Sequence, residues 1–425
     1  MSFGNYSSYL ARRVGQNNCC CEPGATGPIG PRGPSGVDAV GNTGPTGPTG
    51  NSGLTGTLGI TGTIWSDYLY WDNQFDPANP QWRVGSTGLH IGAHAGEFGP
   101  QGLAGTAVGF YAGYTGQSEF AVAMGASAAA VNQGANAVAI GHNAGYTGQQ
   151  GNAIAIGPTS GNSGQQGNAI AIGANAGNSG QQRNAIAIGA NAAPTKQEQL
   201  AIAIGTSAGQ TQQKSQAIAI GNSAGNAQQS ELAIAIGAAA GLNQQRPTTI
   251  AIGNKAGEDQ QNTNSVAIGT LAGQRAQASS GSSKQGAIAI GLKAGLSEQR
   301  QSCIAIGNQA GEIVQGAIPT PAGEGFSIAI GERAGNNNQG SFTIAIGNQA
   351  GASSQENYAI AIGNQAGNNN QQANSIILNA SGSSLNNSAA AYGGAVNVPK
   401  SFLVNPIRNS KNQKFVLYYN PLPTG

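Results

Sequence analysis

The stretch Ala153-Ile154-Ala155-Ile156-Gly157, with its near copies, decides the fold. Its closing glycine returns about every 16 residues, which is the fixed period of a repeat array. Two intervals, 269 to 291 and 307 to 331, are longer by about 6 and 8 residues, so we expect two loops inserted into an unbroken stack. The closing glycines are Gly109, Gly125, Gly141, Gly157, Gly173, Gly189, Gly205, Gly221, Gly237, Gly253, Gly269, Gly291, Gly307, Gly331, Gly347 and Gly363.

Each repeat has a second half, made of a small-residue turn and a polar run. Gly205-Thr206-Ser207-Ala208-Gly209 is one such turn, and the polar run carries paired glutamines such as Gln149-Gln150. A period near 16 is too short for helical hairpin repeats of about 34 to 47 residues. The alternation of Ile and Ala is a strand signal. We therefore expect an all-β, parallel β-solenoid with two short strands and two turns per coil, about 4.8 Å between coils, and amide ladders of glutamine.

Both faces of the repeated strand are apolar. Ile154 and Ile156 lie on one face and Ala153 and Ala155 on the other, and the pattern leaves open which face points into the coil. We interpret the isoleucines as the repeat core, each worth roughly 1.5 to 3 kcal/mol when buried. The small alanines predict a surface that another chain approaches closely, because so thin a coil would complete its burial by association. The predicted core isoleucines are Ile154, Ile156, Ile170, Ile172, Ile186 and Ile188.

The composition excludes several classes of function. Charged residues make up 8% of the chain, Gly accounts for 69 of 425 residues, and the net charge is +2. Nothing in that balance favours nucleic acid or an anionic membrane as a partner. No apolar run approaches the ~20 residues of a membrane span, and residues 1–17 lack the apolar core of a signal peptide. We therefore expect a surface role to depend on lysis or on assembly inside the producing cell.

A second repeat occupies residues 24–63, where glycine recurs at every third position except at Val37-Asp38-Ala39-Val40. Only glycine fits at the axis of three wound chains, so we expect a collagen-like triple helix, on the order of 100 Å long, and hence a homotrimer. A flexible Gly/Pro linker is the alternative. The axial glycines include Gly24, Gly27, Gly30, Gly33, Gly44, Gly47 and Gly50.

Residues 1–23 form a polar tail that contains consecutive Cys19, Cys20 and Cys21. These cysteines predict interchain disulfides that staple the trimer or anchor it to capsid or other fibre proteins. Acylation, metal contact or no role are the alternatives.

Residues 64–86 contain all three tryptophans, Trp65, Trp71 and Trp82. Large aromatic side chains dominate the packing energy of a small core, so we interpret this segment as a neck that trimerises and registers the chains. A receptor-contacting aromatic patch is the alternative.

Residues 87–379 form the repeat domain, with about 18 coils and a length near 85 Å. Its two loops, roughly 274–286 and 312–326, are candidates for recognition, with neutral insertion as the alternative. His90 and His94 lack partner ligands at metal-binding spacing, so we expect no metal site.

Residues 380–425 leave the period of the repeat. Two runs, 401–404 and 415–419, have the composition of strands, and we expect this segment to cap the open end of the solenoid.

Catalytic constellations are missing from the sequence. The carboxylates Glu198, Glu231, Glu298 and Glu332 are scattered, and no spacing predicts the facing pair, about 5 to 9.5 Å apart, that glycan cleavage needs. No glycine-rich loop precedes a predicted helix, which argues against a phosphate site. We expect no enzyme and no cofactor.

The strand phrase resembles the head repeats of trimeric autotransporter adhesins. Asn264-Ser265-Val266-Ala267-Ile268-Gly269 is the closest copy. The resemblance covers residues 87–379 and implies three left-handed parallel β-rolls packed side by side.

A resemblance over most of the chain is to the collagen-like, adhesin-head-like surface fibre proteins of giant DNA viruses. It implies a structural homotrimeric fibre at the virion surface or in the extracellular space, which acts as a spacer and in attachment to a host glycan or receptor. A bacterial secreted or spore-surface filament is the alternative, and a glycan-processing spike is the third. The stretches that carry the resemblance are Tyr70-Trp71-Asp72, Gln81-Trp82-Arg83-Val84-Gly85-Ser86, Ser375-Ile376-Ile377-Leu378-Asn379-Ala380-Ser381-Gly382, Phe402-Leu403-Val404-Asn405-Pro406-Ile407-Arg408 and Leu417-Tyr418-Tyr419-Asn420-Pro421.

Overall fold

The computed structural model describes residues 68–72, 81–85, 87–99, 102–278, 286–317, 325–387 and 400–406. These residues form strands and turns without a helix, which confirms the all-β prediction. The predicted anchor with Cys19, Cys20 and Cys21, the collagen-like stalk, Trp65 and the predicted strand at 415–419 lie outside the described residues.

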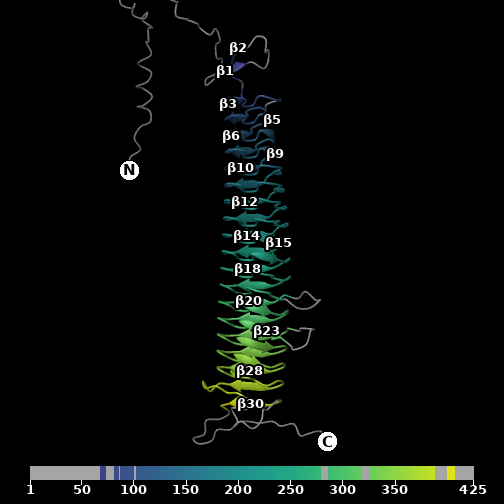
Figure 1. The fold of residues 1–425 in the computed structure, drawn as a ribbon, viewed down its shortest axis with the longest axis vertical. Helices are drawn as coiled ribbons and strands as arrows, with labels where there is room; N and C mark the ends of the chain where they lie inside the picture. Colours follow the sequence, from purple (N-terminus) through teal and green to yellow (C-terminus); the bar gives the residue numbers. More distant parts are fainter. Residues whose placement is uncertain are drawn as a thin grey trace, which may run out of the picture. The chain divides into compact units, whose positions relative to one another are not determined.

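One parallel ladder of 19 strands stacks along the long axis of the repeat domain (Figure 1). Each strand pairs in register with the strand one coil further on, so that Ile154 lies opposite Ile170 and Ile170 lies opposite Ile186. The predicted parallel β-solenoid is therefore confirmed. The strands are β3 (Leu89–Ile91), β4 (Thr106–Val108), β6 (Val122–Met124), β8 (Val138–Ile140), β10 (Ile154–Ile156), β11 (Ile170–Ile172), β12 (Ile186–Ile188), β13 (Ile202–Ile204), β14 (Ile218–Ile220), β16 (Ile234–Ile236), β18 (Ile250–Ile252), β19 (Val266–Ile268), β20 (Ile288–Ile290), β22 (Ile304–Ile306), β24 (Ile328–Ile330), β26 (Ile344–Ile346), β28 (Ile360–Gly363), β29 (Ile376–Asn379) and β30 (Phe402–Asn405).

Shorter parallel ladders form the second side of the coil, and single bridges such as Thr147 to Ser163 continue the column between them. Each coil therefore has the two strand segments that the period predicts. The strands of this side are β5 (Thr115–Gln117), β7 (Val131–Gln133), β9 (Thr147–Gln149), β15 (Ala227–Gln229), β17 (Asn243–Gln245), β21 (Ser297–Gln299), β23 (Ile313–Ala317), β25 (Asn337–Gly340) and β27 (Ser353–Gln355).

The two longer repeats leave the main ladder intact, as predicted. Val266 pairs with Ile288 across the first insertion, and Ile304 pairs with Ile328 across the second. On the second side, the pairing of β23 with β25 shifts register between Gln315 and Ala317. The central residues of both predicted recognition loops, 279–285 and 318–324, lie outside the described part of the chain.

The interior of the coil is lined by alanine, glycine and glutamine. Ala155, in the middle of β10, is fully buried, and so is Gln165 on the opposite side. A Cβ atom built on Gly161 would lie 3.2 Å from the Cβ of Ala155 and 2.6 Å from Oε1 of Gln165. A space this narrow accommodates a methyl group but no larger side chain from the main strand.

This packing corrects two predictions about the repeated strand. The isoleucines point out of the coil and are half-buried, so they do not form its interior; alanines do. The alanine surface is enclosed by its own coil, so no other chain can cover it. The outward residues include all six predicted core positions, Ile154, Ile156, Ile170, Ile172, Ile186 and Ile188.

The predicted glutamine ladder exists, and it runs inside the coil. Nε2 of Gln213 donates to the main-chain oxygens of Ile202 at 2.7 Å and Ala217 at 3.1 Å. It also donates to Oε1 of Gln229, in the next coil, at 3.0 Å. Every bond between successive glutamines runs from Nε2 to Oε1 of the C-terminal neighbour, so most of these buried groups have a partner. The Oε1 atoms of Gln117 and Gln339 are buried without a partner among the described residues.

Glycine closes the main strands from β3 to β28, whereas Asn379 and Asn405 end the last two strands, β29 and β30. Gly205 has a φ of 126°, and a Cβ atom at this position would lie 2.6 Å from the main-chain oxygen of Gly221. The stacked closing glycines therefore approach one another too closely for any side chain.

The two ends of the solenoid depart from the repeat. Before the first coil, β1 (Leu69–Asp72) and β2 (Gln81–Val84) form an antiparallel hairpin. The hydroxyl of Tyr68 donates to the main-chain oxygen of Gly88 at 2.8 Å, which joins the hairpin to the first coil. At the other end, Ile377 and Leu403 replace the inward alanine and are fully buried. The predicted strand at 401–404 is confirmed, because β30 extends the ladder beyond β29.

Candidate functional site: the outer face of the solenoid

A row of apolar side chains, here called the outer face, points outward from the main ladder. It consists of the first and third residues of the three-residue strands, such as Ile154 and Ile156 in β10. Most are half-buried by their neighbours in adjacent coils, while Ile140 and Ile362 are more exposed. Single, scattered apolar residues are normal on the surface of a soluble protein, whereas this row of isoleucine and valine forms a continuous apolar surface.

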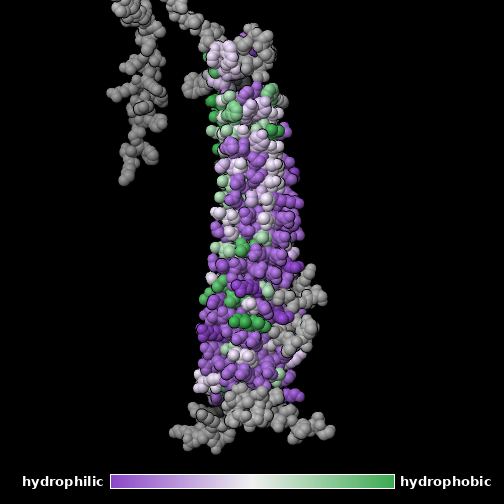
Figure 2. Space-filling view, viewed as in Figure 1, coloured by the Kyte–Doolittle hydropathy of each residue, from purple (hydrophilic) through white to green (hydrophobic). Residues whose placement is uncertain are grey.

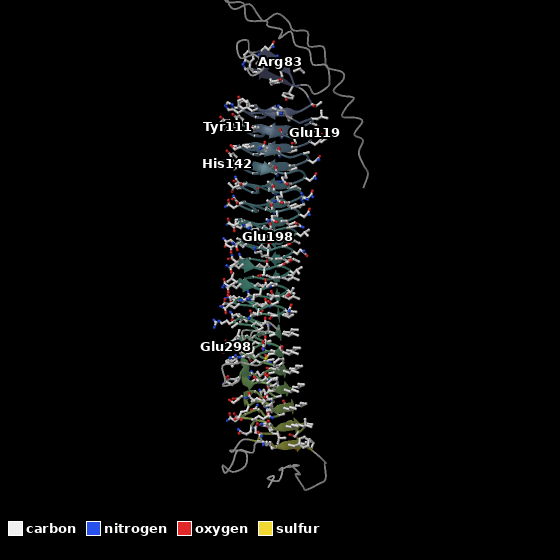
Figure 3. All side chains as sticks on the ribbon, turned by 90° about the vertical axis from the view of Figure 1, so that its right-hand side faces the viewer. Arg83, Tyr111, Glu119, His142, Glu198 and Glu298 are labelled. Carbon is white, nitrogen blue, oxygen red and sulfur yellow. The ribbon has the colours of Figure 1, made fainter. Side chains whose placement is uncertain are left out.

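The outer face is bordered by two edges. In Figure 3, Tyr111 and His142 lie along one edge of the roll, and Glu119 lies along the opposite edge. Tyr111 and His142 belong to the turn after a main strand, and Glu119 to the turn before one. Figure 2 shows one side of the molecule, mostly hydrophilic, with apolar side chains gathered near the first coils and again in the C-terminal half.

An aromatic cluster formed by His94, Phe98, Phe110, Tyr111 and Tyr114 lies in the first coils. The rings of His94 and Tyr111 stack at 4.6 Å, and those of Phe98 and Tyr114 meet edge to face at 5.0 Å. Phe110 is 54% exposed. The repeat pattern did not predict this cluster, although its aromatic residues stand at positions that later coils fill mostly with small or polar residues.

The Glu97 carboxylate lies beside this cluster. The ring of His94 bonds to the carboxylate of Glu97. Desolvation and the Glu97 carboxylate raise the pKa of Tyr114. The cluster therefore combines aromatic rings with one carboxylate in the first coils.

His90 and His94 have separate environments. His90 takes the place of the inward alanine in β3, opposite Ala107, and burial lowers its pKa. Its Nε2 atom is buried without a hydrogen-bond partner among the described residues. His94 lies in the aromatic cluster. No group of three or more metal-binding side chains occurs in the described part of the chain.

The neck tryptophans that the structure describes form a pair. Trp71 in β1 lies opposite Trp82 in β2, with ring centroids 5.4 Å apart in an edge-to-face arrangement. Both remain about half exposed in the single chain. The hairpin thus presents two large apolar rings to its surroundings, and their role in trimerisation stays a prediction.

Cys303 occupies the first position of its strand phrase and is fully buried. Burial raises the pKa of its thiol to about 11. A thiol in this state is unreactive at neutral pH, which fits a packed residue.

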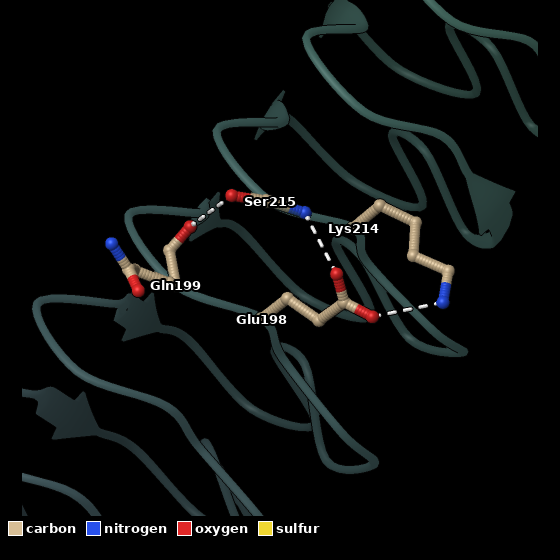
Figure 4. Close-up of polar contacts among 4 residues, drawn as sticks. All are labelled: Glu198, Gln199, Lys214 and Ser215. Atoms are coloured by element: carbon tan, nitrogen blue, oxygen red, sulfur yellow. Dashed lines mark hydrogen bonds and ion pairs between the residues drawn. The ribbon is translucent and has the colours of Figure 1, made fainter.

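The sparse carboxylates link neighbouring coils. Glu198 lies 2.8 Å from Nζ of Lys214, and its second oxygen accepts from the main-chain nitrogen of Ser215 at 3.2 Å (Figure 4). The hydroxyl of Ser215 donates to the main-chain oxygen of Gln199 at 3.2 Å. These contacts join two coils at the surface and give Glu198 a structural role.

The described residues include no helix long and apolar enough to cross a membrane. Comparisons of this chain with protein-family models, with curated proteins and with solved structures found no match.

Proposed function

We propose that this chain forms a homotrimeric structural fibre at the surface of a virion. In this proposal, residues 24–63 wind into a collagen-like stalk, and three left-handed solenoids continue it side by side. The fibre acts as a spacer and in attachment to a host glycan or receptor. The tail with Cys19, Cys20 and Cys21 fastens it to capsid or other fibre proteins.

The observation that carries the proposal is the continuous ladder of 19 strands. At ~4.8 Å per strand, it forms a roll about 90 Å long. Backbone pairing connects each coil to the next, and the buried glutamine ladder reinforces most of these junctions, so the roll resists bending and shortening. A long, stiff body with few charges suits a spacer.

The outer face supports self-association. Its two outward side chains per strand span about 7 Å, so over the ladder the face covers roughly 600 Å². A standard interface buries about 800 Å² on each partner. The face alone is smaller than that, so a stable contact with a second copy would also use the edges of the face. The association predicted from the sequence is retained, but the isoleucine surface takes the place of the alanine surface.

The position on a virion and the attachment role rest on the resemblance to giant-virus surface fibres. The cluster of exposed aromatic rings around Phe110, close to the first coils, supports a role in contact with other molecules, because such patches mark interaction sites.

Sedimentation equilibrium of the full chain tests the oligomeric state, and three chains are expected. A stable monomer or dimer would refute the proposal. Electron microscopy should reveal a thin stalk that continues into a thicker head. Antibodies against the head should label intact particles of the source, and labelling only of a bacterial filament or spore would favour the alternative origin.

A separate variant tests the stalk. Gly47→Ala should lower the melting temperature of the rod and leave the melting of the solenoid unchanged, because alanine does not fit at the axis of three wound chains. Circular dichroism distinguishes the two transitions. An unchanged rod transition would argue against a triple helix.

A further inference from the structure

One column of residues runs along the edge of the outer face, two positions before the first outward residue of each strand. We call it the pre-strand column; Asn152, which precedes Ile154, is a member. Most of its residues are Asn, Gln, Ser or Thr. From Phe120 to Asn374, the members that are not glycine have φ between +54° and +61°, the left-handed region. Asparagine tolerates this conformation far better than aromatic or other large side chains do.

Large apolar residues nevertheless occupy part of this column. Phe120 and Tyr358 are 53% and 55% exposed, and Leu200, Leu232 and Phe326 are more than 40% exposed. Each combines an unfavourable backbone conformation with an apolar side chain in water. Neither property stabilises a single chain, so a contact outside the chain is the simplest reason for these residues. The apolar members are Phe120, Leu200, Leu232, Phe326, Phe342 and Tyr358.

Three of these residues form an aromatic ladder in successive coils. The rings of Phe326 and Phe342 are 5.4 Å apart, those of Phe342 and Tyr358 are 5.2 Å apart, and both pairs are nearly parallel. Stacking covers the ring faces within the ladder and leaves the outward edges of Phe326 and Tyr358 open. The result is a rigid apolar ridge that advances by one coil per ring.

The ridge adjoins the outer face. Phe326, Phe342 and Tyr358 lie two residues before Ile328, Ile344 and Ile360, the first residues of β24, β26 and β28. The edge that it follows is the one marked by Glu119, the neighbour of Phe120, in Figure 3. The apolar surface therefore continues from the outward isoleucines onto the ring edges.

A second copy of this chain fits the ridge better than an unrelated partner does. A copy has the same step of ~4.8 Å between coils, so its own rows match the ring spacing over several coils. A heterologous contact, in which one edge of a subunit meets the other edge of its neighbour, closes into a ring around a threefold axis.

We propose that the pre-strand column is the edge at which neighbouring copies meet, with Phe326, Phe342 and Tyr358 as its main contact. The inference rests on the proposed homotrimer and identifies which part of the solenoid holds it together. Partner chains bury the ring edges, and this burial offsets the unfavourable backbone of the three residues.

The triple variant Phe326→Asn, Phe342→Asn and Tyr358→Asn tests the proposal. It introduces the residue that other coils carry at the same φ, so each coil should fold at least as well as before, as monitored by circular dichroism. Sedimentation equilibrium should show that the protein concentration at which trimers dissociate rises at least about tenfold. Tyr146→Asn is the matched control: Tyr146 is 39% exposed, and the next coil has Asn162 at that position on the second side.

A photocrosslinking amino acid at position 342 gives a readout that does not depend on stability. It should link chains to one another, whereas the same amino acid at position 146 should not. If the unmodified protein is a trimer, but the triple variant dissociates at the same concentration and position 342 yields no crosslinked chains, the inference is overturned and the trimer stands. A monomeric unmodified protein would overturn both.

Discussion

Replacing a glutamine of the interior ladder should destabilise the solenoid by an amount that depends on its place in the ladder. We compare Gln213→Leu with Gln315→Leu. Both glutamines are fully buried, and both accept from the preceding glutamine at 2.9 Å. Each donates to two main-chain oxygens, Gln213 at 2.7 and 3.1 Å and Gln315 at 2.8 and 3.4 Å.

The two sites differ in the coil that follows. Gln213 donates to Oε1 of Gln229, whereas the corresponding oxygen of Gln339 is buried without a partner among the described residues. The change at Gln213 therefore leaves a buried acceptor unpaired, and the change at Gln315 leaves no additional one. A buried acceptor that loses its partner costs about 1 to 3 kcal/mol, and this is the expected difference between the variants.

Hydrogen exchange measured by mass spectrometry is the appropriate assay, because repeat arrays open locally. For each variant we compare the exchange rate in the following coil with the rate in the same coil of the unmodified protein. This acceleration should be about 5- to 150-fold greater in the coil of Gln229 for Gln213→Leu than in the coil of Gln339 for Gln315→Leu. Gln212→Leu, on the exposed neighbour of Gln213, controls for the added apolar group. Equal acceleration in the two coils would refute the directional ladder.

Three further predictions concern single residues. Gly205→Ala places a Cβ atom 2.6 Å from a main-chain oxygen and should lower the free energy of unfolding by at least about 2 kcal/mol. The control, Gly164→Ala, has a φ of 66° and open space around the new Cβ atom, so it should lower the free energy of unfolding in urea by only about 1 kcal/mol. Equal losses in the two variants would contradict the close approach of the coils at Gly205. Because burial raises the pKa of Cys303 from 9.0 to about 11, its neutral form stabilises the fold below pH 9, and this contribution should decline as the pH rises from 9 to 11; Cys303→Ala should abolish that part of the pH dependence, and an unaltered profile would argue against a buried thiol. Because burial lowers the pKa of His90 below 6.5, its neutral form contributes stability above pH 6.5 that is lost on acidification; His90→Ala should make hydrogen exchange in the first coils less sensitive to acid, and equal sensitivity would exclude this ring as the cause.

The spacing of the closing glycines predicted the position of the main strands, because the physical requirement behind them is strict. A residue at the φ of Gly205, stacked directly on Gly221, has no room for a side chain, so the glycine recurs in each coil as far as Gly363. The glutamine ladder was predictable for the same reason, since identical amides in register satisfy one another.

Which face of the main strand points into the coil was not predictable from its pattern. Ala155 and Ile156 alternate, and either set forms an apolar face; the choice depends on the width of the interior, which Gly161 and Gln165 on other parts of the coil determine. The break in the amide ladder after Gln315 was equally hidden, because it accompanies a register shift between β23 and β25.

The candidate site was predicted only in part. The sequence predicted self-association on the alanine surface, and the structure shows that this surface is enclosed by its own coil. The pre-strand column was missed because Phe326 and Asn152 have little in common as residue types, and only the backbone shows that they occupy equivalent positions. Trp71 and Trp82 were predicted, together with Trp65, to belong to a trimerising neck, and the structure adds that these two rings meet across a hairpin.

Most coils between Gln117 and Gln261 offer their neighbours the same in-register backbone pairs and the same amide contact, so one of these coils could replace another. A tandem duplication or loss of a single 16-residue unit would leave all remaining junctions as they were and would lengthen or shorten the roll by ~4.8 Å. The length of the solenoid can therefore change in small steps while the contacts between the remaining coils are kept.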